Sequence, residues 1–392
     1  MISLFLGYES NDEKIVNGIS PILKALGINV WEYKSSLKMS DIFTQEIEQT
    51  IERSADGAMF IISKNTLSSK YTLEIEVPKA IRRMRQDAKF FVFFLIYKAD
   101  YSILKSIPAQ VTDVYSKIIY DFDFSNLLEI SSEILHKMLS INIGPKTDSI
   151  QLKVSDRGNM NLDEEALLNC DLAEVLGRKE QITLKNWEKI QKIISKLKGT
   201  LSKITSNTQI IFDAKLRYCS SFLFGYTFRQ TTGFTFQLEY MNQNWSTPTT
   251  LKSKYNYLQK PTPSISRVSK NLIVDISLTH PNSRVIDTYL NRYPDQLLEK
   301  DDSRIILILD DLPNRSSVEN EEMAQNIPLQ IYEEVLTTIN EYSCETVHIF
   351  YNGPYQIILF LGWLWNKGPR LFLYEYNGEE QTYYKKPYQV IL

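Results

Sequence analysis

Two acidic side chains lie close together in one short segment of the chain. Glu74 and Glu76 stand in the stretch TLEIEVPKAI, residues 72–81, which follows an apolar run that ends at Ser63. A carboxylate can stabilise positive charge that develops in a transition state. Residues two apart on a helix point about 200° away from each other, so both cannot face one site. The segment therefore predicts one working carboxylate rather than a pair.

Pro78 favours one of the two carboxylates. Proline suits the first turn of a helix and disfavours helical geometry in the residue before it. A helix that begins near Pro78 places Glu76 at its mouth, while Val77 and Ile81 can supply a buried side. We therefore favour Glu76 for a chemical role and keep Glu74 as the alternative.

The elements around this segment alternate between strand and helix. Apolar runs predict five strands, at 2–7, 28–33, 58–63, 90–97 and 116–120. Helical spacing and helix boundary signals predict four helices, at 12–26, 42–51, 78–84 and 124–139. This alternation favours a doubly wound α/β fold with a parallel sheet. Ligands of such sheets bind beyond the carboxyl ends of the strands.

Four stretches of the first 140 residues carry a family pattern. They are LFLGYESND, GINVWEYKSSLKMSDIFTQEIEQTI and GAMFIISKNTLSSKY, residues 4–12, 27–51 and 57–71, and Glu76-Val77-Pro78. On these stretches the first 140 residues resemble a TIR domain. The BB loop of that family would be residues 33–41. In enzymatic TIR domains a glutamate after the serine-ending third strand is catalytic, and Glu76 takes that place.

The spacing departs from many TIR domains, in which the glutamate follows a tryptophan by four residues. Here the aromatic residue is Tyr71, and Ile75 stands four residues on. Glu76-Val77-Pro78 is instead similar to the Glu-Leu-Pro of many bacterial TIR domains. The resemblance therefore implies Glu76 as the catalytic residue, with Glu74 kept open.

Cleavage of NAD at the nicotinamide–ribose bond is the activity that the resemblance implies. Nicotinamide leaves as a neutral molecule, so it needs no general acid, and the transition state resembles an oxocarbenium ion. Water captures the sugar in hydrolysis, and an adenine nitrogen captures it in cyclisation. We expect contacts to NAD, by stacking where the side chain is aromatic, from Tyr8, Ser10, Trp31, Tyr33 and Phe43.

The rest of the chain predicts a linker and a second α/β region. Gly144-Pro145 breaks the preceding helix and 145–165 is polar, so we interpret 141–180 as a linker or loosely packed connector. Within 181–392, residues 220–240 and 356–376 form a weak repeat of an apolar helix, a turn with glycine and a strand. Two related halves could form a shared cleft, and chance similarity is the alternative.

Residues 181–392 contain the helices with Gly225 and Gly362, LFLYEY at 371–376 and YYKKPYQVIL at 383–392. In these features the region resembles the SAVED domain of bacterial antiphage (CBASS) systems. SAVED domains resemble two fused CARF domains, in agreement with the repeat. The resemblance implies binding of a cyclic oligonucleotide, cyclic tri-adenylate being favoured, that a partner cyclase makes.

No motif assigns the residues that would hold this ligand, so strand ends supply the candidates. Cationic side chains can pair with phosphate, hydroxyl groups can donate to it, and aromatic rings can stack on a base. The candidates are Lys215, Arg217, Trp245, Ser277, Thr279, His280 and Tyr355.

Composition limits the remaining classes. The net charge of −3 argues against direct binding of DNA. Three scattered cysteines and three scattered histidines predict a reducing, cytoplasmic setting and neither a metal site nor a resident cofactor. The strongest apolar run, 90–97, is far below the roughly 20 residues of a membrane span. Motifs of ATPases and dinucleotide-binding dehydrogenases are absent from the sequence.

Together these features predict an NAD glycohydrolase that a cyclic oligonucleotide switches on. A ligand that favours an assembled state drives self-association, and head-to-tail contacts generate open filaments. Two alternatives stay open: a non-enzymatic TIR scaffold that recruits a partner, and an NAD cyclase that makes a signal.

Overall fold

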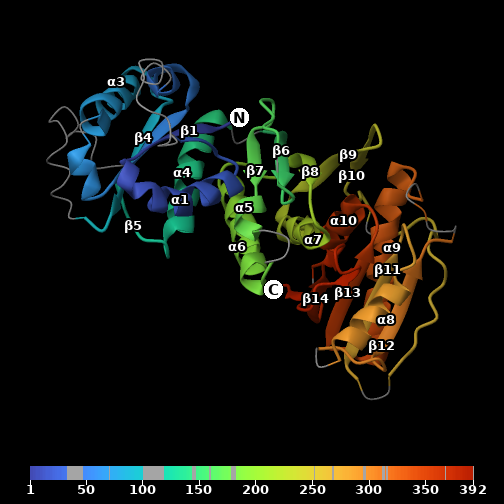
Figure 1. Cartoon of the computed structure of the whole chain (residues 1–392). Coiled ribbons are helices and arrows are strands. Elements are labelled where there is room, and N and C mark those ends of the chain that lie inside the picture. Colours follow the sequence, from blue (N-terminus) through green and yellow to red (C-terminus); the bar gives the residue numbers. More distant parts are fainter. Residues whose placement is uncertain are drawn as a thin grey trace.

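The computed structural model places three five-stranded sheets along the described part of the chain (Figure 1). The first and third sheets lie at opposite ends of the molecule, with the second sheet between them. The residues that the structure describes are 1–32, 47–69, 71–99, 119–143, 147–158, 160–177, 182–250, 252–266, 269–294, 297–310, 314, 317–366 and 368–391.

The first domain is built on a parallel sheet in the order β2-β1-β3-β4-β5, so the predicted doubly wound fold is confirmed. Leu4 and Leu6 of β1 join the core beneath α1 and α4, while Phe5 joins the core beneath α3. Both faces are covered, which is why the apolar runs are continuous. The elements are β1 (Ser3–Gly7), α1 (Glu13–Ala25), β2 (Asn29–Glu32), β3 (Gly57–Ile62), α3 (Val77–Gln86), β4 (Phe91–Tyr97), β5 (Ile119–Phe122) and α4 (Leu127–Asn142).

The predicted linker over 141–180 is wrong for most of its length. β6 and β7 lie there, and β6 pairs in parallel with both β7 and β8. Along β6, Ile150, Leu152 and Val154 are buried between polar neighbours, a period of two that a half-buried strand requires. The first half of the C-terminal region consists of β6 (Ser149–Ser155), β7 (Leu168–Asp171), α5 (Ala173–Leu176), α6 (Leu184–Ser202), β8 (Gln209–Lys215), α7 (Tyr218–Thr227), β9 (Thr235–Tyr240) and β10 (Gln243–Ser246).

The second half repeats the first. Its sheet has the order β12-β11-β13-β14-β17, and the sheet of the first half has the matching order β7-β6-β8-β9-β10. The last strand of each sheet is antiparallel to its neighbour. The repeat that the sequence predicts is therefore confirmed. The elements are β11 (Asn271–Ser277), α8 (Ser283–Arg292), β12 (Ser303–Ile308), α9 (Glu321–Tyr342), β13 (Thr346–Asn352), α10 (Tyr355–Leu364), β14 (Arg370–Tyr374), β15 (Tyr376–Asn377), β16 (Thr382–Tyr383) and β17 (Tyr388–Gln389).

The two halves meet where α7 crosses α10. A Cβ atom on Gly225 would lie 1.9 Å from the carbonyl oxygen of Leu359, and one on Gly362 would lie 2.3 Å from that of Phe222. Only glycine allows two helix backbones to approach so closely. The two repeat glycines that the sequence analysis singles out therefore fix the contact between the halves.

The first domain packs directly on the first half. α1 and α4 share one hydrophobic core with β6, β7 and α6. The backbone N–H of Ile2 donates to the carbonyl of Leu167 at 3.1 Å. Gly27 has a φ of +91°, and a Cβ atom there would lie 2.6 Å from Leu168 Cβ. The first domain and the first half of the C-terminal region thus meet in a packed interface.

Candidate functional site

Glu76 lies in a single π-helical turn, Thr72–Glu76, that runs directly into α3. Pro78 stands in the first turn of α3, as the sequence predicts. Val77 is fully buried in the core beneath α3, and the adjacent Glu76 side chain is only 6% exposed. Glu74 is exposed. Of the two candidate carboxylates, only Glu76 lies in a protected environment.

One oxygen of this buried carboxyl is unsatisfied. Glu76 Oε2 has no hydrogen-bond partner among the described residues. Burial raises the pKa of Glu76 to about 7, and a side-chain hydrogen bond with Thr72 partly opposes this shift. An ionised carboxylate with little water around it attracts a nearby positive charge far more strongly than it would in bulk water. The group is therefore suited to stabilise a cationic transition state.

A second buried carboxylate ties the end of β1 to the segment after β3. Asp12 is 2% exposed and accepts hydrogen bonds from Ser63 Oγ at 2.6 Å and from Asn65 Nδ2 at 2.7 Å. The backbone N–H of Ser63 in turn donates to Thr66 Oγ1 at 2.9 Å. This network fixes the start of the segment that carries Glu76. The sequence analysis did not select Asp12, although its position after an apolar strand was a usable signal.

Of the residues predicted to contact NAD, the structure describes Tyr8 and Ser10, which follow β1, and Trp31, which lies in β2. Tyr8 is partly buried and packs against the core, and Ser10 is exposed. The ring of Trp31 stacks on Phe5 with 5.3 Å between the centroids, so part of its surface serves core packing. Tyr33 and Phe43 lie outside the described residues. Contact of these residues with NAD stays a prediction.

A cavity of about 560 Å³ opens between the two halves of the C-terminal region. It is bounded by the starts of α6 and α7, by the end of β14 and by the segment that leads into β17. Its size falls in the range of small-molecule sites. The lining residues are Ile182, Thr183, Leu184, Lys185, Trp187, Cys219, Leu373, Glu375, Tyr384, Lys385, Lys386 and Tyr388.

The cavity combines positive charge with aromatic surface. Lys185, Lys385 and Lys386 are exposed at its lining, and Trp187 is buried beside them. Lysines pair with phosphate as point charges, and aromatic rings offer faces for bases. Apart from the two lysines near the carboxyl end, which belong to the YYKKPYQVIL stretch, the sequence analysis missed these residues. They come from separate segments, so no local pattern joins them.

Two buried carboxylates hold the amino end of α7 beside this cavity. Asp156 accepts two hydrogen bonds from the backbone N–H of Arg217, at 3.0 and 3.1 Å. Glu375 accepts one from the N–H of Cys219 at 3.0 Å. Burial raises the pKa of Glu375 to about 7 and also raises the pKa of Asp156. The amino end of α7, which would suit an anionic ligand, is thus occupied by the carboxylates of Asp156 and Glu375.

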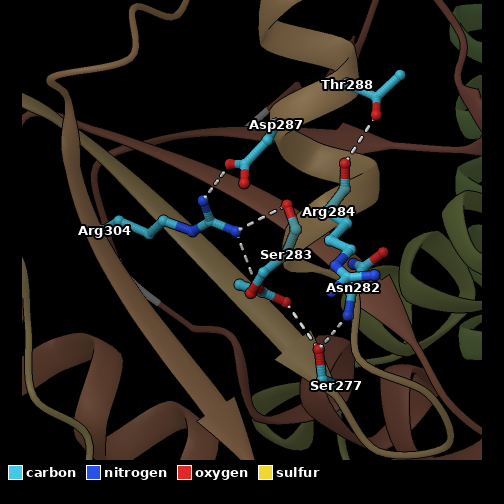
Figure 2. Close-up of polar contacts among 8 residues, drawn as sticks. Ser277, Asn282, Ser283, Arg284, Asp287, Thr288 and Arg304 are labelled. Atoms are coloured by element: carbon cyan, nitrogen blue, oxygen red, sulfur yellow. Dashed lines mark hydrogen bonds and ion pairs between the residues drawn. The ribbon is translucent and has the colours of Figure 1, made fainter.

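The matching loop of the second half is fixed by a different network. Figure 2 shows Ser277, Asn282, Ser283 and Arg304 converging at the start of α8. The N–H of Asn282 donates to Ser277 Oγ at 3.0 Å, and Ser277 Oγ donates to Asp275 at 2.9 Å. The fully buried Asp275 also pairs with Arg304 Nη2 at 3.0 Å. These contacts with buried side chains fix the position of the loop between β11 and α8.

Four of the residues predicted to bind a cyclic oligonucleotide lie at strand ends that surround the junction of the halves. Lys215 is exposed at the end of β8, and Arg217 directly precedes α7. Thr279 donates to Asn352 Oδ1 at 2.5 Å, which joins the ends of β11 and β13. His280 is exposed beside it. None of the four lines the cavity, although Arg217 is two residues from Cys219, which does.

Three further predictions need correction or restriction. Trp245 is fully buried in β10, where its ring packs at 4.2 Å from Tyr240, so stacking on a base is wrong for this residue. Ser277 is 1% exposed and its hydroxyl is used by Asp275, so it positions a loop and does not face a ligand. Tyr355 is partly buried at the start of α10 and packs against the core.

Comparison with protein families assigns both regions. Residues 4–127 match the model of the TIR domain. Residues 193–386 match the model of the SMODS-associated and fused to various effectors sensor domain, SAVED. The chain is a fusion of a TIR domain and a SAVED domain. Both resemblances that the sequence analysis drew are confirmed, and no protein of curated function matches the chain.

Two solved structures share the fold of the TIR–SAVED chain. The Acinetobacter baumannii Cap4 SAVED/CARF-domain containing receptor with the cyclic trinucleotide 2′3′3′-cAAA is 13% identical, with a TM-score of 0.52 over 91% of this chain and 87% of that one. The same receptor with 3′3′3′-cAAA is 12% identical, with a TM-score of 0.51 over 96% and 97%. At these identities the similarity establishes the fold.

Three observations complete the description of the TIR–SAVED chain. No helix among the described residues is long and apolar enough to cross a membrane. The described residues contain no group of three His, Cys, Asp or Glu side chains placed to hold a metal ion. Cys170, Cys219 and Cys344 are free and buried.

Proposed function

We propose that the chain is an NAD glycohydrolase of antiphage defence that a cyclic oligonucleotide activates. The observation that carries the proposal is the buried Glu76 carboxyl with its unpartnered Oε2, in the segment between β3 and α3 of a TIR domain. An unsatisfied buried carboxylate is costly to the fold, and such groups concentrate at functional sites. Glu74, two residues away and exposed, has no comparable environment.

In the proposed reaction, the bond between C1′ of the ribose and the nicotinamide nitrogen breaks. The bonding electron pair leaves with nicotinamide, which becomes neutral, and positive charge develops on the ribose ring. The Glu76 carboxylate stabilises this charge. Water then adds to C1′ and loses a proton, which gives ADP-ribose. In the cyclase alternative, an adenine nitrogen attacks C1′ instead of water.

The SAVED cavity is the proposed site of the activating ligand. Receptors of the same fold are described with cyclic trinucleotides, and we favour cyclic tri-adenylate for this chain on that ground. Lys185, Lys385 and Lys386 supply positive charge for phosphates, and Trp187 and Tyr384 supply aromatic surface. A partner cyclase would make the ligand.

Activation is proposed to occur through assembly. The TIR domain shares a core with the first half of the SAVED domain, so a change in one half can move the whole TIR domain as a unit. A ligand shifts an equilibrium only by its preference for one state. We therefore propose that ligand-bound protomers associate head to tail into oligomers or filaments, in which TIR domains are brought together.

The experiment that tests this function measures NAD turnover with a panel of cyclic di-, tri- and tetranucleotides. Chromatography of the products separates ADP-ribose from cyclic ADP-ribose, and light scattering of the same samples reports assembly. Turnover to ADP-ribose that requires one ligand and coincides with assembly supports the proposal. If no ligand of the panel evokes NAD turnover, the proposal of a ligand-gated enzyme is contradicted. Full activity of a monomer contradicts activation by assembly.

A further inference from the structure

The amino end of α7 is the feature from which this inference starts. The first N–H groups of a helix have no partner inside the helix and carry partial positive charge, which makes them suited to phosphate. In α7, a helix of 10 residues, the N–H groups of Arg217 and Cys219 donate instead to the carboxylates of Asp156 and Glu375. Both carboxylates are nearly fully buried, at 3% and 5% exposed.

A buried arginine adds to the positive character of this helix end. Arg217 is 7% exposed, and its Nε has no hydrogen-bond partner among the described residues. A buried guanidinium with a free donor has capacity for a further anionic oxygen. The end of α7 therefore holds more donor capacity than its two carboxylates use.

Glu375 differs from Asp156 in its origin. Asp156 belongs to the first half, as does α7, whereas Glu375 directly follows β14 of the second half. The hydrogen bond from Cys219 to Glu375 thus joins the halves, and both residues line the 560 Å³ cavity. The carbonyl of Glu375 also accepts from the N–H of Tyr384 at 3.0 Å. Glu375 is therefore connected to the segment that carries Lys385 and Lys386.

We propose that the Glu375 carboxylate occupies the place of a ligand phosphate, and that a phosphodiester group entering the cavity displaces it from the amino end of α7. The inference rests on the proposed function of the cavity. Two anions cannot share the same donor, so the Cys219 N–H passes from the carboxylate to the phosphate. Loss of the Glu375 bond releases the second half from α7 at this point, which couples ligand binding to movement between the halves.

The test compares binding of cyclic tri-adenylate to the wild-type chain, Glu375→Gln, Glu375→Asp and Glu379→Gln by calorimetry. Glu375→Gln keeps the size and removes the charge, so we expect about tenfold tighter binding. Glu375→Asp retains the negative charge at this position. Glu379→Gln removes one negative charge, as Glu375→Gln does, but at an exposed position. Both should bind within about twofold of wild type.

The outcomes separate the two proposals. If the wild type binds cyclic tri-adenylate and Glu375→Gln binds it with equal or lower affinity, the inference is overturned, while the cavity stands as the ligand site. No binding by any variant overturns the proposed ligand and the inference with it. If Glu375→Gln does not fold, Asp156→Asn removes a charge at the same helix end and should also tighten binding. A parallel titration with inorganic phosphate must show no saturable binding, because saturation by the free ion would overturn the assignment to a phosphodiester.

Discussion

Gly225 and Gly362 occupy equivalent places in a reciprocal crossing of two helices. Gly225 of α7 faces the backbone of Leu359 and Trp363 in α10, and Gly362 of α10 faces the backbone of Phe222 and Tyr226 in α7. The contacts are reciprocal, so each half of the SAVED domain presents its glycine to the helix of the other. The crossing therefore holds together the same two halves whose junction forms the proposed ligand cavity.

Substitution at this crossing should be severely destabilising. In Gly225→Ala the new methyl group meets backbone atoms of α10, which cannot turn away, so we expect a loss of about 3 kcal/mol or more in the free energy of unfolding. Gly199→Ala in α6 is the matched control, since no atom lies within 4 Å of its Cβ position. It should be neutral or stabilising by up to about 1 kcal/mol. Denaturant unfolding measures both, and equal stability of the two variants contradicts the close crossing.

Replacing Glu76 by glutamine should stabilise the protein at alkaline pH. Its pKa is raised from 4.5 to about 7 in the fold, so the folded chain favours the protonated carboxyl. The contribution of the protonated Glu76 to the free energy of unfolding is fully present below pH 4.5 and is lost as pH rises through about 7. Glu76→Gln avoids the loss, which amounts to about 3 kcal/mol by pH 8. Melting temperatures at pH 5 and pH 8 test this, and a gain that does not grow with pH is the contrary result.

NAD turnover should rise with pH across neutrality. The proposed reaction needs the ionised Glu76 carboxylate, and the raised pKa places its ionisation at about 7. We expect kcat, measured with saturating activator, to increase about tenfold between pH 6 and pH 8. A kcat that is constant over this interval contradicts a role for a carboxyl group with this pKa.

Asp12 is expected to position the segment that leads to Glu76. In Asp12→Asn the amide nitrogen faces a donor, Ser63 Oγ or Asn65 Nδ2, and one hydrogen bond of the network is lost. We expect kcat to fall about tenfold with an unchanged pH midpoint, because Asp12 acts through geometry alone. Glu9→Gln is the control, as its hydrogen bonds are exposed. A wild-type kcat in Asp12→Asn rules out the positioning role.

Arg304 is expected to be essential to the stability of the second half. Arg304→Met leaves the fully buried Asp275 without its cationic partner, which costs about 3 kcal/mol or more. Arg292→Met removes an exposed pair with Glu380 and an exposed contact with the Tyr293 ring, and should change stability by less than about 1 kcal/mol. Denaturant unfolding of the two variants compares a buried with an exposed ion pair, and similar losses contradict the network in Figure 2.

Local patterns in the sequence predicted much of the first domain. Continuous apolar runs identified the strands of a sheet covered on both faces. The prediction that a helix begins at Pro78 with Glu76 at its start is wrong, because Glu76 and Val77 both have helical backbone and the turn Thr72–Glu76 runs unbroken into α3. The fifth strand was predicted at 116–120; residues 116–118 lie outside the described part of the chain, and β5 is described over Ile119–Phe122. Of the predicted helix 42–51, only 47–51 falls within the described residues.

The sequence analysis failed where structure depends on distant partners. β6 alternates over only seven residues among polar neighbours, and its pairing with β8 is what makes it a strand. Trp245 looked like a free aromatic residue, because its burial depends on Tyr240 and on the packing of the whole sheet. The cavity draws Lys185, Glu375 and Lys386 from segments that only the fold brings together.

The central claim is that Glu76, and not Glu74, carries the chemistry of the TIR domain. The most direct measurement is NAD turnover by Glu76→Gln and Glu74→Gln at pH 8 with the activating cyclic oligonucleotide at saturation. The account predicts a loss of at least about 100-fold for Glu76→Gln, as expected for removal of a charge that stabilises the transition state, and near wild-type turnover for Glu74→Gln. Retained turnover in Glu76→Gln together with its loss in Glu74→Gln would contradict the account.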